Sequence, residues 1–372
     1  MYSFWKYLFD QNLTTQEIKD VFADIYPSDD MDQKVFFFDP NKKVSFFNPG
    51  IYGTDEIQAA LFRNQFPRDC SSRKFIISHK HMSGFGSMIH VLGSVLGIGL
   101  DHNRTVIFDP NYTPIYSKND QCRGKVGLDC YLMPISNCTF TAEEIASNPQ
   151  KFMRSNDPSP FPQFIITFIE KTGTPKSLYL FDWRIQSAFF ITKLKNYTRM
   201  NVSLFREKYL VNPKEHYDVS VSIIQGDKYL EMPLAPPKYY TYPIELIHKL
   251  LGRKISVFVC SDAQFPITYF STLNQSKFEF SYFNHRRPEK GYAQGKNVTH
   301  SFIFMIQSFA DLFETTKGQN MIGTLGSNWN RLMLELRLQQ DTTMNLPYFE
   351  VGSLPCISPN HCKHLNSRLY IQ

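Results

Sequence analysis

The chain has 372 residues, of which 42% are hydrophobic and 20% are charged, and its formal net charge is +6. This length and composition exclude intrinsic disorder as a description of the whole chain and suit two domains of ordinary size. A mildly basic chain without a long Lys/Arg run suits a small anionic ligand better than nucleic acid, so we expect no nucleic-acid partner.

The N-terminal part of the chain has a mixed pattern. A helical pattern at 15–23 and Phe-rich extended pieces at 35–47 lie on either side of a polar cluster that contains Asp30 and Asp32. The Asp-Met-Asp sequence matches the D-x-D pattern of many metal-dependent glycosyltransferases, but a solvated acidic turn is the simpler interpretation. We treat residues 1–70 as an N-terminal extension.

The next segments predict a strand, a glycine turn, a helix and a second strand. The apolar run 75–77 is followed by Gly84 and Gly86, by an apolar segment of helical length that ends at Leu100, and by the β-branched run 104–108. This order is a βαβ unit. The glycines serve either close packing or a close approach to a ligand, since the third glycine of a dinucleotide fingerprint is absent.

The remainder of the chain alternates between strands and helices. A loop-rich stretch at 112–160 precedes helical patterns at 183–195, 244–251, 300–316 and 328–338, and strands are expected at 219–224, 255–260 and 320–324. This alternation implies a parallel, doubly wound sheet. We therefore predict an α/β fold with an open α/β domain at 71–212, a Rossmann-like domain at 213–345 and a C-terminal tail at 346–372.

Hydropathy gives no sign of a transmembrane segment. No run approaches about 18 uninterrupted apolar residues, the length that a spanning helix needs. The best candidate, 88–100, contains His90 and several glycines and is too short. The N-terminus also lacks the apolar region of a signal peptide, which leaves a cytoplasmic location open.

Cysteines and glycosylation sequons instead favour the secretory pathway. Cys122 and Cys130, and Cys356 and Cys362, are spaced to close small disulfide loops, while Cys260 lies in an apolar run and is expected to be a buried thiol. No C-x-x-C pair occurs, so a zinc ribbon is not expected. Sequons outnumber the about three expected by chance. They begin at Asn12, Asn103, Asn111, Asn137, Asn196, Asn201, Asn274 and Asn297.

Polar residues beyond the ends of the predicted strands are candidate ligand-binding residues, because doubly wound sheets bind ligands at the carboxyl ends of their strands. Asp227, Lys228 and Glu231 follow the first strand of the second half. They suit either an ordinary turn or an anion-handling loop that contains a carboxylate base. Asp262 follows the next strand, where it could equally be a helix N-cap.

The last predicted strand leads into a helix through a turn that contains Ser327 and Asn328. The backbone N–H groups there can hold a phosphate with help from the helix dipole, and simple capping explains the sequence equally well. His79, His81 and His90 cluster earlier in the chain, but their spacing fits no standard zinc motif. We expect no metal site.

Several segments together resemble the α1,6-fucosyltransferase family, which includes the enzymes that core-fucosylate N-glycans and the rhizobial enzymes that fucosylate chitin oligosaccharides. In chain order they are 84–90 with 103–108, 134–139, 183–186 (similar to the family's W-R-x-Q), 219–228, 257–262, and 310–313 with 323–331. No single motif is specific, but their order and spacing are. The resemblance covers about residues 74–340.

This resemblance implies a two-domain, GT-B-like enzyme that binds GDP-fucose in its C-terminal half and transfers fucose to a GlcNAc-containing glycan. Family members invert the anomeric centre and need no metal or other cofactor. The family setting implies the Golgi lumen. By position, Asp311 would contact guanine, Ser327 and Asn328 would hold the phosphates, and Glu231 would be the nearest candidate base.

The resemblance also assigns residues to two functional groups. It places at the donor site Gly84, Gly86, His90, Asp262, Arg286, Asp311, Ser327 and Asn328, and in the catalytic group Glu231, Asp227 and Lys228. The two glycines would let the backbone of the first domain approach the donor.

One departure from the family concerns the phosphate site. The family carries H-x-R-R where this chain has Ser-Ile-Ile-Gln at 222–225, and Ala263 replaces a second family carboxylate. An Arg fork binds phosphate oxygens through two hydrogen bonds, which neither Ile nor Gln can do. Losing one such contact commonly costs about 10²–10³ in rate. Lys228, Arg286 or Arg287 could compensate.

Two hypotheses follow from the matches and the departure. The chain is a working fucosyltransferase with a rebuilt phosphate site, which we favour, or a catalytically inactive relative that binds a nucleotide or a glycan.

Overall fold

The computed structural model describes residues 54–78, 84–110, 122, 127–155, 179–226, 228, 234–288, 302–340 and 348–351. Several sequence predictions lie outside these residues: the helix at 15–23, the extended pieces at 35–47 with Asp30 and Asp32, the histidines His79 and His81, and the cysteines Cys356 and Cys362.

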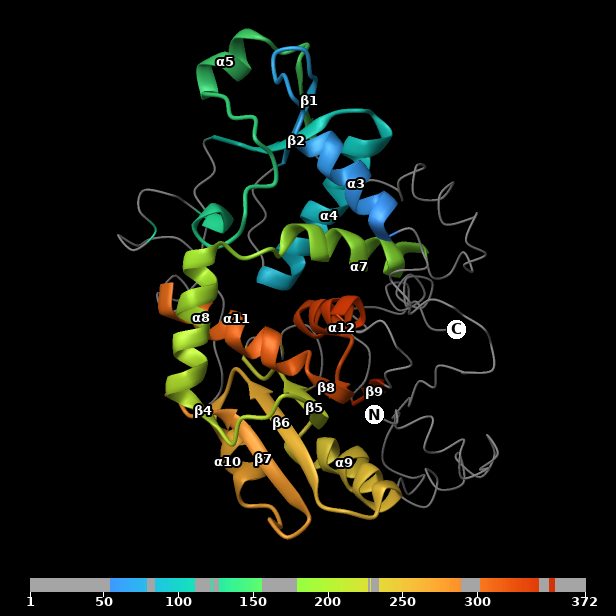
Figure 1. The fold of residues 1–372 in the computed structure, drawn as a ribbon, viewed down its shortest axis with the longest axis vertical. Helices are drawn as coiled ribbons and strands as arrows, with labels where there is room; N and C mark the ends of the chain where they lie inside the picture. Colours follow the sequence, from blue (N-terminus) through green and yellow to red (C-terminus); the bar gives the residue numbers. More distant parts are fainter. Residues whose placement is uncertain are drawn as a thin grey trace.

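Six strands form the larger sheet in the order β4–β7–β6–β5–β8–β9 (Figure 1). Their bounds are β4 Leu210–Val211, β5 Tyr217–Ile223, β6 Ile255–Ser261, β7 Phe278–Phe283, β8 Gly318–Gly323 and β9 Tyr348–Glu350. Strands β5 to β9 pair in parallel, while β4 pairs antiparallel with β7. The chain runs outward from β5 to β7 and returns to β8 on the other side of β5. This Rossmann-like order, with a switch point between β5 and β8, confirms the predicted doubly wound sheet.

Helices cover both faces of this sheet. Their bounds are α9 Pro237–Leu251 and α10 Gln264–Ser271 for one face, and α11 Phe302–Thr315 and α12 Asn328–Gln340 for the other. Alternation along β6 separates two cores: Val257 and Val259 pack with α9 and α10, whereas Phe258 and Cys260 pack with α11 and α12. β6 has a nearly continuous apolar sequence, as expected of a strand buried on both faces. β5 was recognisable from apolar residues that alternate with Asp218, Ser220 and Ser222.

The smaller sheet has three parallel strands in the order β2–β1–β3. Its strands are β1 Phe75–Ser78, β2 Thr105–Phe108 and β3 Phe152–Ser155, and the helices of this half are α3 Thr54–Gln65, α4 Phe85–Asp101, α5 Ala142–Ser147 and α7 Tyr179–Ile191, with a 3₁₀ turn, η2, at Gly127–Cys130. Helix α4 connects β1 to β2, so the predicted βαβ unit is confirmed. Helix α8 (Asn196–Tyr209) leads from this half into the larger sheet.

One apolar core joins the two halves. Helix α12 packs against both α4 and α7, and these helices lie between the two sheets in Figure 1. Leu92 of α4, Trp183 of α7 and Leu332 and Met333 of α12 belong to the same buried cluster. The two halves are therefore α/β units with a shared helical layer.

Two elements pack with a unit other than the segment to which the sequence prediction assigned them. Helix α3 falls in the predicted N-terminal extension, yet its Ile57 and Leu61 are buried in the core that contains α4. Strand β9 falls in the predicted tail, yet it pairs with β8. We keep the two-domain division as a proposal, with each element assigned to the unit in which it packs.

Two disulfides lie among the described residues. Cys122–Cys130 was predicted from its spacing, while Cys70–Cys138 was not. Cys260 is a buried free thiol, as expected. Disulfides persist in oxidising compartments, so both bonds are compatible with a secretory lumen.

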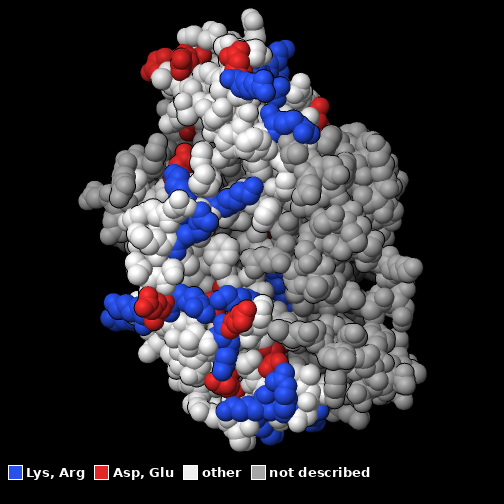
Figure 2. Space-filling model, in the orientation of Figure 1, with Lys and Arg blue, Asp and Glu red and all other residues white. Residues whose placement is uncertain are grey.

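The described helices include none that is both long and apolar enough to cross a membrane. Figure 2 shows basic and acidic side chains mixed over one face of the molecule. On this face, the described Lys and Arg side chains form separate groups rather than one continuous track.

Candidate functional site

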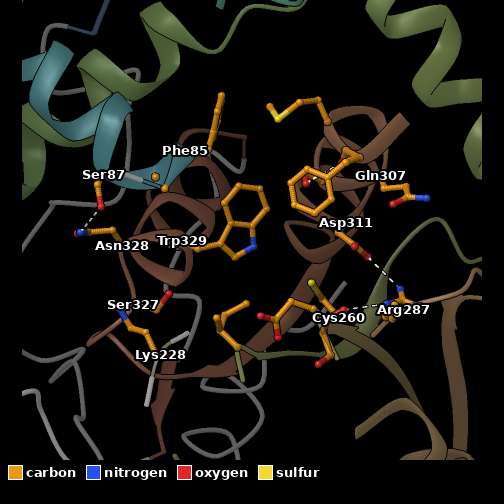
Figure 3. Close-up of a pocket in the computed structure, with 18 of the residues that line it drawn as sticks. Phe85, Ser87, Lys228, Cys260, Arg287, Gln307, Asp311, Ser327, Asn328 and Trp329 are labelled. Atoms are coloured by element: carbon orange, nitrogen blue, oxygen red, sulfur yellow. Dashed lines mark hydrogen bonds and ion pairs between the residues drawn. The ribbon is translucent and has the colours of Figure 1, made fainter. Parts of the chain in front are cut away.

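A cavity of about 190 Å³ lies where the two units meet. It is lined by the start of α4, the segments that follow β5, β6 and β7, one side of α11 and the first residues of α12 (Figure 3). A single buried water needs only about 10–15 Å³ of such space, so this cavity has room for a ligand of many atoms. It lies beyond the carboxyl ends of the parallel strands, as expected for this fold.

One end of the cavity is formed by the N-terminus of α12. Strand β8 ends at Gly323, a turn closes with the Ser327 N–H donating to the carbonyl of Thr324 (3.0 Å), and the helix begins at Asn328. The first N–H groups of a helix lack partners within the helix, and its dipole favours anions there. Lys228 is buried and lies beside Ser327 in Figure 3. This end combines an ammonium group with a helix N-terminus.

Asp262 organises the loop that follows β5. Its carboxylate accepts hydrogen bonds from the backbone N–H groups of Gln225 (2.8 Å) and Gly226 (2.9 Å). The N-cap of α10 is the next residue, Ala263. Asp262 therefore fixes the backbone that leads to Lys228.

A buried ion pair forms the opposite end of the cavity. The Nε of Arg287 donates to the carbonyl of Ser261 (2.8 Å) and its Nη1 to the carbonyl of Phe283 (2.7 Å). Its Nη2 lies 3.9 Å from Oδ1 of Asp311, and neither atom has a hydrogen-bond partner among the residues that the structure describes. A donor and an acceptor thus lie side by side with unmet hydrogen-bonding capacity, although both residues are almost fully buried.

Burial controls the charges at this end. Burial raises the pKa of Asp311 to about 7, while Arg287 opposes the rise and the negative charge of Asp262 adds to it. Burial and the nearby Arg287 lower the pKa of His285 to about 4, so this imidazole is neutral. Its Nδ1 lies 3.2 Å from the carbonyl of Arg286 and donates to it, which leaves Nε2 as a buried acceptor with no partner in the described part of the chain.

Most of the described predicted residues come together at the cavity. Its lining includes Gly84, Gly86, Lys228, Asp262, Asp311, Ser327 and Asn328. Arg286 is exposed and is not part of the lining, whereas Arg287 is. Asp227 and Glu231 lie outside the described residues, so their roles stay predictions.

Gly86 serves the contact between the two units. A Cβ at this position would lie 2.5 Å from the backbone oxygen of Asn328. No side chain fits there, because backbone atoms of α12 occupy the space. This close approach of α4 and α12 explains Gly86 without any ligand.

His90 does not reach the cavity. It is buried, with Nε2 2.9 Å from Oε2 of Glu335 and Nδ1 3.2 Å from Oδ1 of Asn328. Burial lowers the pKa of His90, and the carboxylate of Glu335 opposes this effect. The structure therefore places His90 behind Asn328, which lines the cavity, and not at the cavity itself.

Sequence reasoning missed the contribution of α11 other than Asp311. Phe304, Gln307 and Ser308 also line the cavity. They precede Asp311 by seven, four and three residues, which is the spacing of one helix face. Because Asp311 was already a candidate ligand contact, this spacing could have predicted that the same helix face lines the cavity.

Comparisons with known proteins find similarity of fold alone. No protein-family model matches the chain, and no curated protein matches its sequence. NodZ alpha-1,6-fucosyltransferase soaked with GDP-fucose is 12% identical, with 71% of this chain and 93% of that chain covered and a TM-score of 0.39. A mutant of Arabidopsis thaliana FUT1 in complex with GDP is 12% identical, with coverages of 79% and 75% and a TM-score of 0.41. POFUT1 in complex with GDP-fucose is 11% identical, with coverages of 78% and 99% and a TM-score of 0.39.

Proposed function

We propose that this protein is a glycosyltransferase that binds GDP-fucose in the cavity between its two α/β units. The observation that carries the proposal is the difference between the two ends of the cavity. One end suits an anion, and the other holds a buried donor and acceptor without partners. A nucleoside diphosphate sugar has a matching arrangement, with phosphates at a distance from a hydrogen-bonding base.

The diphosphate would lie against the N-terminus of α12. Backbone N–H groups of the first turn, the hydroxyl of Ser327 and the ammonium of Lys228 supply donors and positive charge. These groups would also stabilise the charge that develops on GDP as it leaves. They take the place of the two arginines that the family carries after β5.

The base would lie against Arg287 and Asp311. Guanine presents N–H donors next to the acceptor O6, so one edge can donate to a carboxylate and accept from a guanidinium. Nη2 of Arg287 and Oδ1 of Asp311 are the unpartnered atoms of the required types. Binding guanine would satisfy both, which removes the cost of leaving them buried and unpaired.

The transfer would be a single inverting displacement at the anomeric carbon. A carboxylate, Glu231 or Asp227, would take the proton of the acceptor hydroxyl as the bond to GDP breaks. The resemblance to α1,6-fucosyltransferases supports a GlcNAc-containing glycan as acceptor, an α1,6 linkage and a reaction without a metal cofactor. The sequons, together with the disulfides, support a Golgi or other secretory lumen as the location.

One observation favours a catalytically inactive, nucleotide- or glycan-binding protein as the alternative. Ile224, which replaces a family arginine, lines the cavity. Gln225 cannot substitute either, because its Nε2 donates to the carbonyl of Ala235 (3.1 Å). The phosphate end therefore depends on Lys228 for its side-chain charge.

Calorimetric titration with GDP, UDP and guanosine tests the proposal, with Lys228→Met as the variant and Lys238→Met as the control, since Lys238 is an exposed residue of α9. A charge-assisted hydrogen bond contributes about 1.5–3 kcal/mol, so we expect Lys228→Met to weaken GDP binding about 10- to 100-fold. Guanosine binding should be unchanged, and UDP should bind weakly.

Failure of the wild-type protein to bind GDP would overturn the proposal. GDP binding without release of GDP from GDP-fucose in the presence of GlcNAc-bearing acceptors would instead support the inactive alternative.

A further inference from the structure

The contact between α4 and α12 contains a buried chain of polar groups that begins at the cavity and runs away from it. Ser87 and Asn328 line the cavity, and the Nδ2 of Asn328 donates to Oγ of Ser87 (2.7 Å). Behind them, Oδ1 of Asn328 lies 3.2 Å from Nδ1 of His90, and Nε2 of His90 lies 2.9 Å from Oε2 of Glu335. The side chains of His90 and Glu335 are only 6% and 1% exposed.

The donors and acceptors of this chain determine where its hydrogens are. The Nη1 of Arg331 donates to Oδ1 of Asn328 (3.2 Å), so this oxygen faces donors and the amide orientation is fixed. Nδ1 of His90 must therefore carry a hydrogen in order to donate to the same oxygen. The remaining contact, between Nε2 of His90 and Oε2 of Glu335, needs a second hydrogen on one of its two atoms. The pair thus holds one proton more than a neutral imidazole and a carboxylate would.

The charged groups around the pair come from two helices. Arg184 of α7 and Arg331 of α12 lower the pKa of His90, and Glu335 of α12 raises it, while burial is the largest influence and lowers it. Among the described residues, Oε1 of Glu335 has no hydrogen-bond partner. The contact of Oε2 with Nε2 of His90 joins α12 of one unit to α4 of the other.

We propose that the proton shared by His90 and Glu335 couples the two units and positions Asn328 and Ser87 at the cavity. While the proton is present, His90 holds Asn328 at the start of α12, and Asn328 holds Ser87 at the start of α4. When the proton is lost, a nitrogen lone pair faces a carboxylate oxygen at hydrogen-bonding distance. The two atoms then repel, and His90 no longer holds Asn328. His90 and Glu335 are positioning residues, and their effect on ligand binding rests on the proposed function.

The Glu335→Gln variant tests this proposal directly. A glutamine amide can donate to neutral Nε2 of His90 and so keeps the hydrogen bond without the shared proton. Because burial lowers the pKa of His90, the shared proton should be lost as the pH rises through the acid range. We therefore expect the wild-type affinity for GDP to fall by about tenfold, relative to Glu335→Gln at the same pH, as the pH rises from the acid range to neutral. Comparing the two proteins at each pH removes the change in affinity that Asp311 causes in both.

Two further variants separate positioning from general structural damage. Glu335→Leu removes the partner of Nε2, so GDP binding should be weakened by at least about tenfold at every pH. Glu314→Gln is the matched control, because Glu314 is a buried carboxylate of α11 that pairs with Arg206 outside the cavity. It should keep the wild-type dependence of affinity on pH. The same dependence of affinity on pH in Glu335→Gln as in wild type would overturn the proposal.

Nitrogen-15 NMR of the imidazole and of the Asn328 side-chain amide tests the proton and the positioning without a ligand. We expect a hydrogen on Nδ1 of His90 at all pH values. A transition in which the shared proton is lost as the pH rises should move the Asn328 amide signal in wild type but not in Glu335→Gln. Absence of that transition would refute the proposal. If wild type failed to bind GDP but showed the NMR transition, the proposed function would fail and the coupling would stand.

Discussion

The carboxyl group of Asp311 has a pKa raised to about 7, chiefly by burial. In the ligand-free protein this group therefore holds a proton at pH 6 and has largely lost it by pH 8. A guanine base that donates N–H groups needs an ionised carboxylate as acceptor. Formation of the proposed complex must then release a proton below pH 7, and affinity for GDP must rise as the pH rises toward that value.

We expect the gain in affinity to approach about tenfold per pH unit below the pKa of Asp311. Calorimetry in two buffers of different ionisation enthalpy measures the proton release directly. Guanosine is the ligand for this test, because the terminal phosphate of GDP itself titrates at about pH 6. Asp311→Asn should bind guanosine without releasing a proton and should lack the rise. Equal wild-type affinities at pH 6 and pH 7.5 would contradict a direct contact between Asp311 and the base.

The adjacent arginines Arg286 and Arg287 provide a matched pair of substitutions. Arg287 is 5% exposed and faces Asp311, whereas Arg286 is exposed and outside the cavity lining. We expect Arg287→Gln to weaken GDP binding by about 10-fold or more, because a charge-assisted hydrogen bond is lost. Arg286→Gln should have no effect. Thermal unfolding of both variants identifies any loss of binding that arises from loss of structure, and equal affinities of the two variants would argue against Arg287 as a base contact.

Sequence reasoning could locate the loop that contains these arginines but not distinguish between them. Both have the same chemistry, and the choice depends on which side chain turns inward after β7 to meet the carbonyls of Ser261 and Phe283. The role of Asp262 was also not predictable from sequence, because it binds the N–H groups of Gln225 and Gly226 in the loop after a neighbouring strand. Such contacts depend on strand order, which a linear pattern does not contain.

At the scale of elements, the contact of α4 with α12 depends on Gly86. A Cβ there would lie 2.5 Å from a backbone oxygen, whereas a Cβ at Gly93 of the same helix would lie 2.5 Å from the side-chain hydroxyl of Ser187. Backbone cannot move aside as a serine hydroxyl can. We expect Gly86→Ala to destabilise the protein by about 1–3 kcal/mol, as overpacked sites do.

Gly93→Ala should cost less than Gly86→Ala, because the side chain of Ser187 can move aside and the backbone of α12 cannot. Both glycines lie in α4, so the preference for alanine over glycine within a helix, about 1 kcal/mol, favours both substitutions. Urea unfolding of both variants measures the difference. A larger loss of stability for Gly93→Ala would contradict the assignment of Gly86 to the contact between units.

Elements with a strong apolar period were predictable from sequence, and others were not. Helices α4 and α11 and strands β5 and β6 are rich in buried apolar residues, and each was expected within a few residues of its bounds. Strand β7 was missed, although its burial alternates in part along its six residues. Helix α8 was missed because its apolar face is sparse, with Thr198 and Phe205 as its buried residues. The Cys70–Cys138 bond joins residues 68 apart, and no spacing rule predicts such a pair.

At the scale of the whole molecule, the two α/β units share one core. Apolar side chains of α4 and α7 from the first unit and of α11 and α12 from the second form a single buried cluster. The indole N–H of Trp183 on α7 donates to the carbonyl of Gly93 on α4 (3.0 Å), within the same layer. Separating the units would expose this cluster to water, at a cost of about 25 cal/mol for each Å² of apolar surface.

We therefore expect the two units to unfold together. Under native conditions, amide hydrogen exchange in β1 of the smaller sheet and in β6 of the larger sheet should report the same free energy of opening. Urea unfolding followed by far-UV circular dichroism and by tryptophan fluorescence should give coincident transitions. Independent units would instead exchange at two distinct free energies and unfold in two steps. That result would mean that the helical layer is only a docking surface, and the cavity between the units could then open without loss of either sheet.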